Sequence, residues 1–413
     1  MSETLKFGNG QWATKVGSTL AYNDEGGNFK PLPFNFTRST SGTRVNKDGL
    51  IEVITNNKPR IDFLNDSNGA LLLEPARTNL ATYSEQFDNA AWGKLYITIN
   101  PNTTDTIDPS GYYGADKIID NATVSSHVVY QASQWGTTQR TASVYAKAGT
   151  SSKVSVLNIS LGTGVFADLS AETIFVSAGF TGTLTSVGNG WFRITATHTA
   201  ATPQTFSIGL FTGTNTNLYG GTGSYAYIWG AQIEQGSYAT SYIPTQGAIS
   251  TRVAEVCIDA GNNQVINSTE GVLFAEIKPI TDDYINDAGT VISSQFNLSD
   301  GNLNNGVNIR FRKTVLQCLY YNGSAYEAVL TYTDISVSET YKVAFLYKQN
   351  DFKMYVNGVL IASDTNGSIG SFTLDRLTFD NSNGVNPFYG NVKDLRVYNT
   401  ALTDQELINL TTI

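Results

Sequence analysis

The sequence contains few charged residues and no cluster of basic ones. Asp, Glu, Lys and Arg make up 15% of the 413 residues, and the net charge is -9. Because nucleic-acid binding needs grouped Lys and Arg to neutralise phosphates, we expect no nucleic-acid partner. No apolar run is long enough to cross a bilayer, so we expect no membrane insertion. The first residues have no basic head followed by an apolar core, so we expect no secretory leader.

Motifs for catalysis are also scarce. The two histidines, His127 and His198, have no second histidine at metal-ligand spacing. His198 continues the inward face of the strand pattern GWFRITATH, which indicates a core or rim histidine. No nucleophile elbow or phosphate-binding loop occurs, and no acidic residue lies in a context that marks it as a general acid or base. We therefore predict that the protein is not an enzyme.

Cysteine is limited to Cys257 and Cys318, too few for a framework of several disulfides. Cys318 lies in the apolar run TVLQCLYYN, where a free thiol packs as a small hydrophobic side chain. We expect both thiols to be buried and reduced. A Cys257–Cys318 bridge is the alternative.

Two short stretches carry oxygen-bearing side chains at alternate positions, as a calcium loop does. They are Asp66-Ser67-Asn68-Gly69 and Asp380-Asn381-Ser382-Asn383-Gly384. Asn391 stands where an EF-hand beginning at Asp380 would have its acidic twelfth ligand. Asx-turns explain both stretches without a metal ion. We predict no cofactor, with calcium at Asp380 and Ser382 as the alternative.

Glycine and aromatic residues are abundant instead, with 38 glycines and 11% Phe, Trp and Tyr. Apolar and polar residues alternate in GWFRITATH, TASVYAKAG and GVNIRFR, which is the pattern of half-buried strands. The inward-facing positions of the first and third are Phe192, Ile194, Ala196, Val307, Ile309 and Phe311. This composition and spacing predict an all-β protein with two consecutive β-sandwich or jelly-roll domains.

The chain divides into three regions by pattern. Residues 1–78 consist of short patterned pieces separated by Gly, Asn, Asp and Pro, which predicts an extended N-terminal attachment arm and connector. Such a segment buries little apolar surface alone, so we expect it to lie on the next domain or on another chain. Residues 79–247 and 248–413 are predicted to be the two β-sandwich domains.

The last region contains two well-defined local signals. Asn357-Gly358 follows an alternating strand, and both residues tolerate the positive φ of a type I′ turn, which predicts a hairpin. Thr403 and Glu406 form a capping-box sequence, with Leu402 and Leu407 placed as a hydrophobic staple. We therefore expect one short C-terminal helix.

Aromatic side chains in loops or at strand ends are the candidate ligand-binding residues, because sugar rings stack on Trp and Tyr. Trp92, Trp135 and the pair Tyr112-Tyr113 fall in such stretches of the middle region. Tyr320 and Tyr321 end a strand in the last region. Packing in the core or at a sheet edge is the alternative for each ring.

Three stretches of the sequence resemble parts of bacteriophage proteins. YIWGAQIEQGSYATSYIPT (residues 227–245), with the GWFRITATH strand before it, resembles the closing strands of carbohydrate-binding-module-like jelly rolls in phage head-spike and tail-fibre proteins. SGTRVNKDGLIEVI and ALLLEPARTNLATYSEQFDNAAW resemble the connector that precedes such modules. YKVAFLYKQNDFKMYVNGVLIAS and the segment up to TALTDQEL resemble a laminin-G-like, concanavalin A-type sandwich. Together these cover about residues 38–410.

The resemblance implies a structural virion protein, a head or tail fibre or spike subunit that contacts host surface glycans. It implies a homotrimer bound to other virion proteins through the N-terminal region, made in the host cytoplasm and exposed on the particle. A capsule-degrading depolymerase and a bacterial secreted lectin or adhesin are the alternatives. Alternation in residues 225–230 leaves both faces of that strand apolar, so we expect it to be central in its sheet, with its rings structural and with Pro244 ending the pairing.

Overall fold

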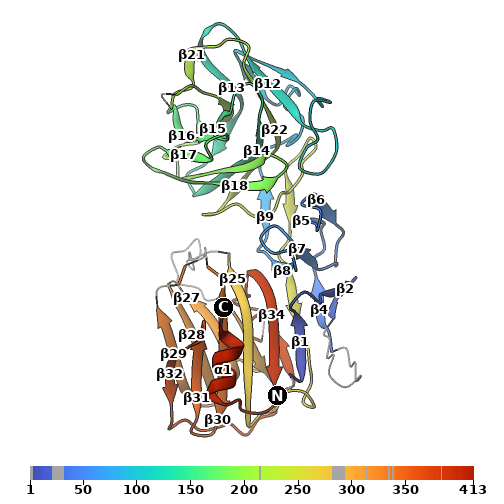
Figure 1. Ribbon diagram of the computed structural model, residues 1–413, viewed down its shortest axis with the longest axis vertical. Helices are drawn as coiled ribbons and strands as arrows, with labels where there is room; N and C mark the ends of the chain where they lie inside the picture. Colours follow the sequence, from blue (N-terminus) through green and yellow to red (C-terminus); the bar gives the residue numbers. More distant parts are fainter. Residues whose placement is uncertain are drawn as a thin grey trace. The chain divides into compact units, whose positions relative to one another are not determined.

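The computed structural model describes residues 3–20, 32–213, 215–280, 294–312, 314–333, 335–336, 339–382 and 384–413. Their contacts form two compact units. Unit 1 comprises Met1–Ser41, Ile54–Pro75 and Val253–Ile413, and unit 2 comprises Gly42–Val53 and Ala76–Arg252. Both are built from antiparallel strands, and α1 (Asp404–Thr411) is the helix found in the described ranges (Figure 1). The predicted all-β class is confirmed.

Unit 1 contains an eight-stranded sheet in the order β32-β31-β30-β25-β34-β8-β7, in which β1 also pairs with β34. Its strands are β1 (Leu5–Gly8), β7 (Arg60–Asp62), β8 (Ala70–Leu73), β25 (Glu270–Pro279), β30 (Tyr341–Lys348), β31 (Phe352–Val356), β32 (Val359–Asp364) and β34 (Gly390–Tyr398).

A five-stranded sheet and a four-stranded sheet complete unit 1, in the orders β29-β28-β27-β26-β33 and β2-β3-β4-β24. The first is formed by β26 (Ser294–Ser299), β27 (Asn305–Arg312), β28 (Val315–Asn322), β29 (Tyr326–Thr333) and β33 (Arg376–Thr378). The second is formed by β2 (Ala13–Lys15), β3 (Ser18–Leu20), β4 (Phe34–Thr37) and β24 (Val256–Ile258).

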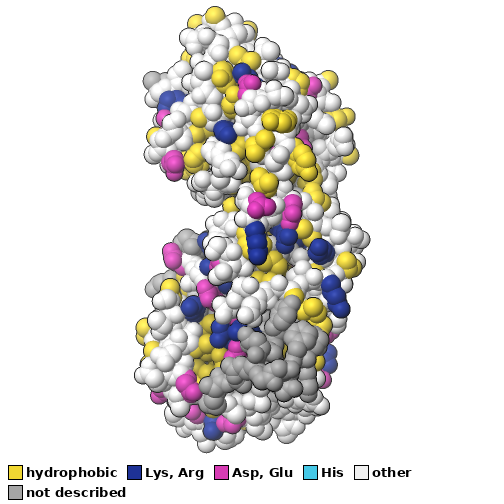
Figure 2. Space-filling view, turned by 45° about the vertical axis from the view of Figure 1, so that its right-hand side comes forward, with side chains coloured by type: hydrophobic (Ala, Val, Ile, Leu, Met, Phe, Trp, Pro, Cys, Tyr) yellow, Lys and Arg dark blue, Asp and Glu magenta, His cyan; other side chains and the backbone are white. Residues whose placement is uncertain are grey.

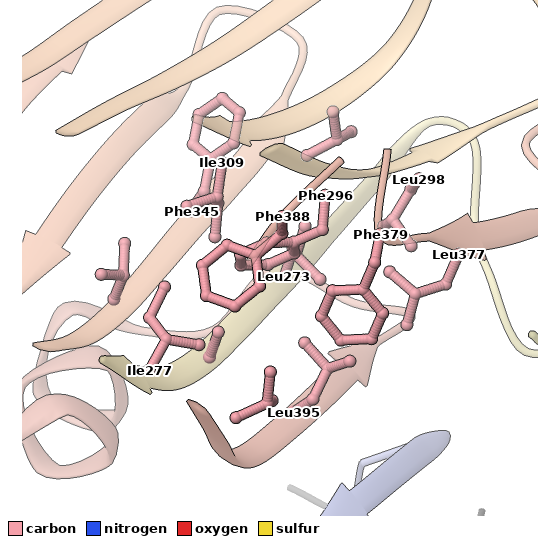
Figure 3. Close-up of a cluster of buried hydrophobic side chains, with 14 of the residues drawn as sticks. Leu273, Ile277, Phe296, Leu298, Ile309, Phe345, Leu377, Phe379, Phe388 and Leu395 are labelled. Carbon is pink, nitrogen blue, oxygen red and sulfur yellow. The ribbon is translucent and has the colours of Figure 1, made fainter. Parts of the chain in front are cut away.

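The core of unit 1 lies between the eight- and five-stranded sheets. Figure 3 shows Leu273 and Leu395, from β25 and β34, on the side opposite Phe296 and Ile309, from β26 and β27. The predicted alternation is confirmed, because Val307, Ile309 and Phe311 are all buried in this core. Cys257 and Cys318 are buried in the same cluster as free thiols, so the alternative of a bridge between them is not realised.

Helix α1 covers part of the outer face of the eight-stranded sheet. Leu402 and Leu407 pack there with Val272, Phe274 and other buried residues of β25, β30 and β31 (Figure 1). Thr403 caps the helix as predicted: its side chain accepts from the Glu406 backbone N–H, and the Glu406 carboxylate accepts from the Thr403 backbone N–H at 2.8 Å. The capping box predicted from the sequence is therefore confirmed. The predicted turn at Asn357-Gly358 is confirmed as well, because these residues have φ of 51° and 82° between β31 and β32.

The N-terminal segment is divided between the two units and does not form a separate arm. Strands β1 and β8 both pair with β34, β1 from Leu5 to Gly8 and β8 from Leu71 to Leu73. Leu5, Phe34 and Leu71 are buried in the core of unit 1. The contacts therefore place most of residues 1–78 with residues 253–413, whereas the predicted boundaries separate them. Strand pairing between distant segments is the physical reason, because local patterning does not reveal it.

A buried ion network connects these distant segments within unit 1. Arg60 donates to Glu255 through Nε and Nη2, both at 2.6 Å, and to Glu74 at 2.8 Å. Arg38 donates to Glu255 at 2.7 Å. All four side chains are almost fully buried, and the two carboxylates help to raise the pKa of Arg60 against the opposing effect of burial. The network is therefore charge-balanced, as a buried group of ions must be.

Unit 2 is a sandwich of a seven-stranded and a six-stranded sheet. The seven-stranded sheet has the order β10-β13-β20-β15-β16-β17, with β21 also pairing with β13, and the six-stranded sheet has the order β11-β12-β22-β14-β19-β18. The first contains β10 (Gly93–Leu95), β13 (Val124–Trp135), β15 (Lys153–Asn158), β16 (Thr163–Asp168), β17 (Thr173–Val176), β20 (Gln204–Leu210) and β21 (Leu218–Gly220). The second contains β11 (Ile97–Asn100), β12 (Asp116–Asp120), β14 (Arg140–Ala148), β18 (Phe180–Gly188), β19 (Trp191–His198) and β22 (Tyr225–Gln235). Two further pairs are β5 (Gly42–Val45) with β6 (Ile51–Ile54), and β9 (Arg77–Asn79) with β23 (Ser250–Arg252).

Strand β22 is central in the six-stranded sheet and is covered on both faces, as its sequence predicts. It pairs with β12 on one side and β14 on the other. Ile228 and Ile233 belong to the core between the two sheets, whereas Tyr227 and Trp229 belong to a second buried cluster on the outer face. The outer cluster includes Ile51 of the β5–β6 hairpin. This hairpin therefore helps to cover the sheet and forms one wall of a pocket in unit 2.

Candidate functional site: a pocket beside the β5–β6 hairpin

An aromatic layer forms the floor of the candidate site. The rings of Trp229 and Tyr242 are 4.7 Å apart, and that of Tyr145 is 5.4 Å from Trp229 and 6.1 Å from Tyr242. Trp229 and Tyr145 project from the neighbouring strands β22 and β14 on the face away from the main core. Trp229 and Tyr242 are each only 2% exposed, so this floor is rigidly packed.

The hairpin and a loop form the walls. Thr43 donates to the Tyr242 carbonyl oxygen at 2.6 Å, and the Ile51 backbone N–H donates to the Pro109 carbonyl oxygen at 2.8 Å. Asn46 closes the hairpin turn, since its side-chain oxygen accepts from the Leu50 backbone N–H at 3.0 Å. The hairpin is thereby fixed to the exit segment of β22 on one side and to the 108–114 loop on the other.

Asp108 holds that loop in shape. One carboxylate oxygen accepts from the Ser110 backbone N–H at 2.7 Å and from the Ser110 hydroxyl at 2.6 Å. The other accepts from the Gly114 backbone N–H at 3.0 Å. The loop can therefore present Tyr112 at the surface on an ordered backbone, and the Tyr112 side chain is 74% exposed.

These elements enclose a pocket of about 500 Å³, within the usual size range of small-molecule sites. Its lining combines apolar, aromatic and polar side chains of unit 2: Thr43, Asn46, Leu50, Ile51, Glu52, Val53, Glu85, Ser110, Tyr112, Trp229, Tyr242 and Pro244. Hydrophobic side chains gather on the face of unit 2 that is turned to the viewer in Figure 2. Rings and methyl groups beside hydroxyls and carboxylates suit a ligand that is itself amphipathic.

Glu85 is the half-buried acid of the pocket. Its carboxylate accepts from the Tyr242 hydroxyl at 2.8 Å, and that hydroxyl is also 2.6 Å from Ser84 Oγ. Burial raises the pKa of Glu85, the negative charge of Asp108 raises it further, and the Tyr242 hydrogen bond opposes both effects. The group can accept hydrogen bonds when ionised and donate one when protonated.

Trp229 is almost fully buried beneath the pocket. Its Nε1 is buried and has no hydrogen-bond partner in the described part of the protein. A buried donor without a partner is costly, and native structures contain few. Because Nε1 is closed off from solvent, the groups that the pocket offers to a ligand are the acid Glu85 and the exposed ring of Tyr112.

Three of the candidate residues expected from the sequence are not available to a ligand. Trp92 and Trp135 are 1% and 0% exposed and donate from Nε1 to the Tyr83 and Leu157 carbonyl oxygens. Tyr320 is also 0% exposed and its hydroxyl accepts from the Gly370 backbone N–H. The alternative of core packing is therefore the correct one for these rings, which fill the interiors of the sandwiches.

Two other predicted rings remain at the surface. Tyr321 is partly exposed and packs edge-on against Tyr326, with ring centroids 4.7 Å apart. Of the pair Tyr112-Tyr113, Tyr112 lines the pocket and Tyr113 is 57% exposed outside it. Sequence reasoning missed Glu85, Leu50 and Trp229 as a group, because they come from three separate elements. The sequence feature that could have pointed to this pocket is the apolar outer face of β22.

The candidate calcium residues have intramolecular partners. Asp380 accepts from the Thr378 hydroxyl at 2.6 Å, the Ser382 backbone N–H at 2.7 Å and the Gly384 backbone N–H at 2.9 Å. The Ser382 hydroxyl contacts Ser299 Oγ at 2.7 Å. This is the Asx-turn arrangement that the sequence offered as an explanation. Within the described ranges, no three His, Cys, Asp or Glu side chains are grouped as metal ligands.

The two histidines have structural surroundings. His127 is fully buried, with its ring nitrogens 2.7 Å and 3.0 Å from the carbonyl oxygens of Tyr96 and Tyr219. His198 stacks on Phe180 with ring centroids 4.1 Å apart and contacts the Gly179 carbonyl oxygen through Nδ1. These positions agree with the core or rim role expected for His198.

Comparison with known proteins gives one family match. Residues 274–408 match the concanavalin A-like lectin/glucanases superfamily, which confirms the predicted class of the C-terminal sandwich. No curated protein matches the chain. No helix in the described ranges has the length and apolar character needed to span a membrane.

Solved structures with partial likeness include three proteins. A sialidase CBM40 from Ruminococcus gnavus bound to α2,3-sialyllactose is 17% identical, covers 37% of this chain and 93% of its own, and has a TM-score of 0.31. Domain 4 of a Geobacillus stearothermophilus arabinanase in complex with arabinotriose is 17% identical, with coverages of 43% and 84% and a TM-score of 0.29. A pentraxin from Limulus polyphemus is 14% identical, with coverages of 35% and 70% and a TM-score of 0.28. At these values, nothing about the ligand of this chain follows from the likeness.

Proposed function

We propose that the protein is a non-catalytic carbohydrate-binding protein and that the pocket of unit 2 is its glycan site. The pocket itself carries the proposal, because it combines an exposed ring, Tyr112, with an acid, Glu85, and with the hydroxyls of Thr43 and Ser110. A sugar presents an apolar face for a ring and a rim of hydroxyls for polar groups. The lectin-like class of residues 274–408, which lie in unit 1, supports carbohydrate binding by the protein, whereas the assignment of the site to unit 2 rests on the pocket alone.

We further propose that the protein is a head or tail fibre or spike subunit of a bacteriophage particle. Support comes from the resemblance of three stretches of the sequence to phage proteins, and from the few charges and many turns expected of an all-β surface protein. Residues 1–78 are proposed to contact other virion proteins. Many copies on one particle would give useful avidity even if each site binds weakly.

A glycan array with the purified full-length protein tests the binding proposal. We expect selective binding to a subset of bacterial surface polysaccharides, abolished or strongly reduced in a Tyr112→Ala variant. An array that is silent for the wild-type protein would overturn the proposal. Clearing haloes around protein spotted on capsulated bacteria would instead support a depolymerase and contradict the non-catalytic assignment.

A further inference from the structure

The charges around the unit 2 pocket carry an inference about ligand class that rests on the proposed function. The lining residues include two acids, Glu52 and Glu85, and no Lys, Arg or His. Arg44, on the same hairpin, pairs with Glu52 at 2.5 Å, so these two charges compensate each other. Asp108 adds a third carboxylate close enough to influence Glu85. A ligand in this pocket therefore meets the uncompensated carboxylate of Glu85 and no Lys, Arg or His among the lining side chains.

An acidic sugar would be disfavoured in such a site. Its carboxylate would lose hydration and gain neither a bidentate Arg contact nor a Lys contact. Like charges also repel more strongly in a half-buried site than in water. Sialic and uronic acids consequently fit the pocket poorly, whereas an uncharged ring bears no such cost.

The remaining groups suit the hydroxyls and the apolar face of an uncharged sugar. Tyr112 is the exposed ring, and Leu50, Val53 and Pro244 provide apolar wall. Glu85 and Ser110 can bond hydroxyls.

We propose that the pocket formed by the β5–β6 hairpin, the 108–114 loop and β22 binds an uncharged hexose or N-acetylhexosamine residue and discriminates against acidic sugars. Tyr112 stacks on the sugar ring, and Glu85 and Ser110 bond its hydroxyls. Discrimination between the two kinds of sugar arises from repulsion of an acidic sugar's carboxylate as well as from contacts with the uncharged sugar.

The test is calorimetric titration of the full-length protein with three matched oligosaccharide series: uncharged, carboxylate-bearing and amine-bearing. We expect the uncharged series to bind more tightly than the carboxylate-bearing series, with an affinity that changes little between low and high salt because no ion pair forms. Tyr112→Ala should weaken this binding about tenfold or more. Tyr113→Ala is the matched control, since Tyr113 is an exposed neighbour outside the pocket, and it should bind like the wild type.

A second variant separates loss of binding from loss of folding. Glu85→Gln keeps an acceptor for the Tyr242 hydroxyl and removes the charge, so we expect the carboxylate-bearing series to bind more tightly than it does to the wild type, with an unchanged circular dichroism spectrum. Tighter binding of the carboxylate or amine series to the wild type, lost in Tyr112→Ala, would overturn the inference on ligand class and leave the glycan site standing. Failure of all three series to bind would overturn the site together with the inference.

Discussion

Glu255 joins three distant parts of unit 1 through one carboxylate. It accepts from Arg38, from Arg60 and from the Glu74 backbone N–H, all at 2.6–2.8 Å. Removing one member of a buried ion network leaves the other charges without compensation. The resulting loss of stability is larger than the net stability that the ion pair contributes. The segments that carry these residues lie far apart in sequence, so the network also specifies which segments pack together.

Replacement of this carboxylate by an isosteric amide should therefore destabilise unit 1. We expect Glu255→Gln to lower its free energy of unfolding by about 3–5 kcal/mol. Denaturant unfolding followed by fluorescence measures the change. Glu270→Gln is the control, because Glu270 pairs with Lys348 at 2.9 Å on the surface and should cost less than about 1 kcal/mol. Equal effects of the two changes would contradict the account.

Asp116 makes the stability of unit 2 depend on pH. Its carboxylate is 1% exposed and accepts from the backbone N–H groups of Phe87 and Asn102, both at 2.9 Å. Burial nevertheless raises the pKa of Asp116 from 3.8 to about 6. The folded state therefore holds the proton more tightly than the unfolded state, and the contribution of Asp116 to stability falls as pH rises from about 4 through about 6.

The size of this effect is up to roughly 3 kcal/mol, at about 1.4 kcal/mol per pKa unit. We expect the difference in unfolding free energy between the wild type and Asp116→Asn to change by that order between pH 4 and pH 7, because asparagine does not titrate. Urea unfolding at several pH values measures it. Parallel pH profiles of the two proteins would show that Asp116 titrates with its ordinary pKa.

At the scale of elements, the two N-terminal strands that lie along β34 protect an otherwise open sheet edge. β1 pairs with one end of β34 and β8 with the other. A nine-residue strand without these partners would expose unpaired backbone groups and invite aggregation. Phe34 and Phe36, 0% and 1% exposed, add buried rings from β4 to the same core.

Deletion of residues 1–41 should consequently disable unit 1 and leave unit 2 folded. It removes β1 and β4 with Phe7, Phe34 and Phe36, each worth about 3–5 kcal/mol in the core. We expect the shortened chain to aggregate or to lose one of two thermal transitions in calorimetry. A soluble product with both transitions at their original temperatures would identify the segment as a dispensable arm.

Local signals in the sequence predicted individual turns, caps and strands. The pairing of strands that are distant in sequence could not be predicted from these signals. The Asn357-Gly358 turn, the Thr403 cap and the two apolar faces of β22 are all visible within a few residues. The pairing of Leu5 with Val397 is not, because a strand pattern does not name its partner. The pocket shows the same limit, since it requires the 42–53 hairpin to fold onto a strand from residues 225–235.

The ring candidates illustrate the corresponding limit at the site. Trp92 and Trp135 lie in stretches that read as loops, yet their indoles are buried and bonded to carbonyl oxygens. Tyr112 lies in a similar stretch and is exposed. The sequence near each ring does not show which rings are buried, because burial depends on the position of elements that are distant in the chain.

At the scale of the whole molecule, the proposed fibre or spike role requires assembly. We expect the full-length protein to form a homotrimer, since closed symmetry would present several glycan sites in parallel. Light scattering coupled to size-exclusion chromatography gives the molar mass, and a trimer of the 44.7 kDa chain is the expected species. A monomer at micromolar concentration would contradict the proposed assembly.

The central claim is that the pocket of unit 2 receives a sugar ring. Its most direct test is a crystal structure of the full-length protein soaked with the uncharged oligosaccharide that binds most tightly in solution. The account predicts density for a sugar ring between Tyr112 and the Glu85 carboxylate, over the Trp229 floor. A sugar bound elsewhere, with the pocket of unit 2 unchanged, would contradict it.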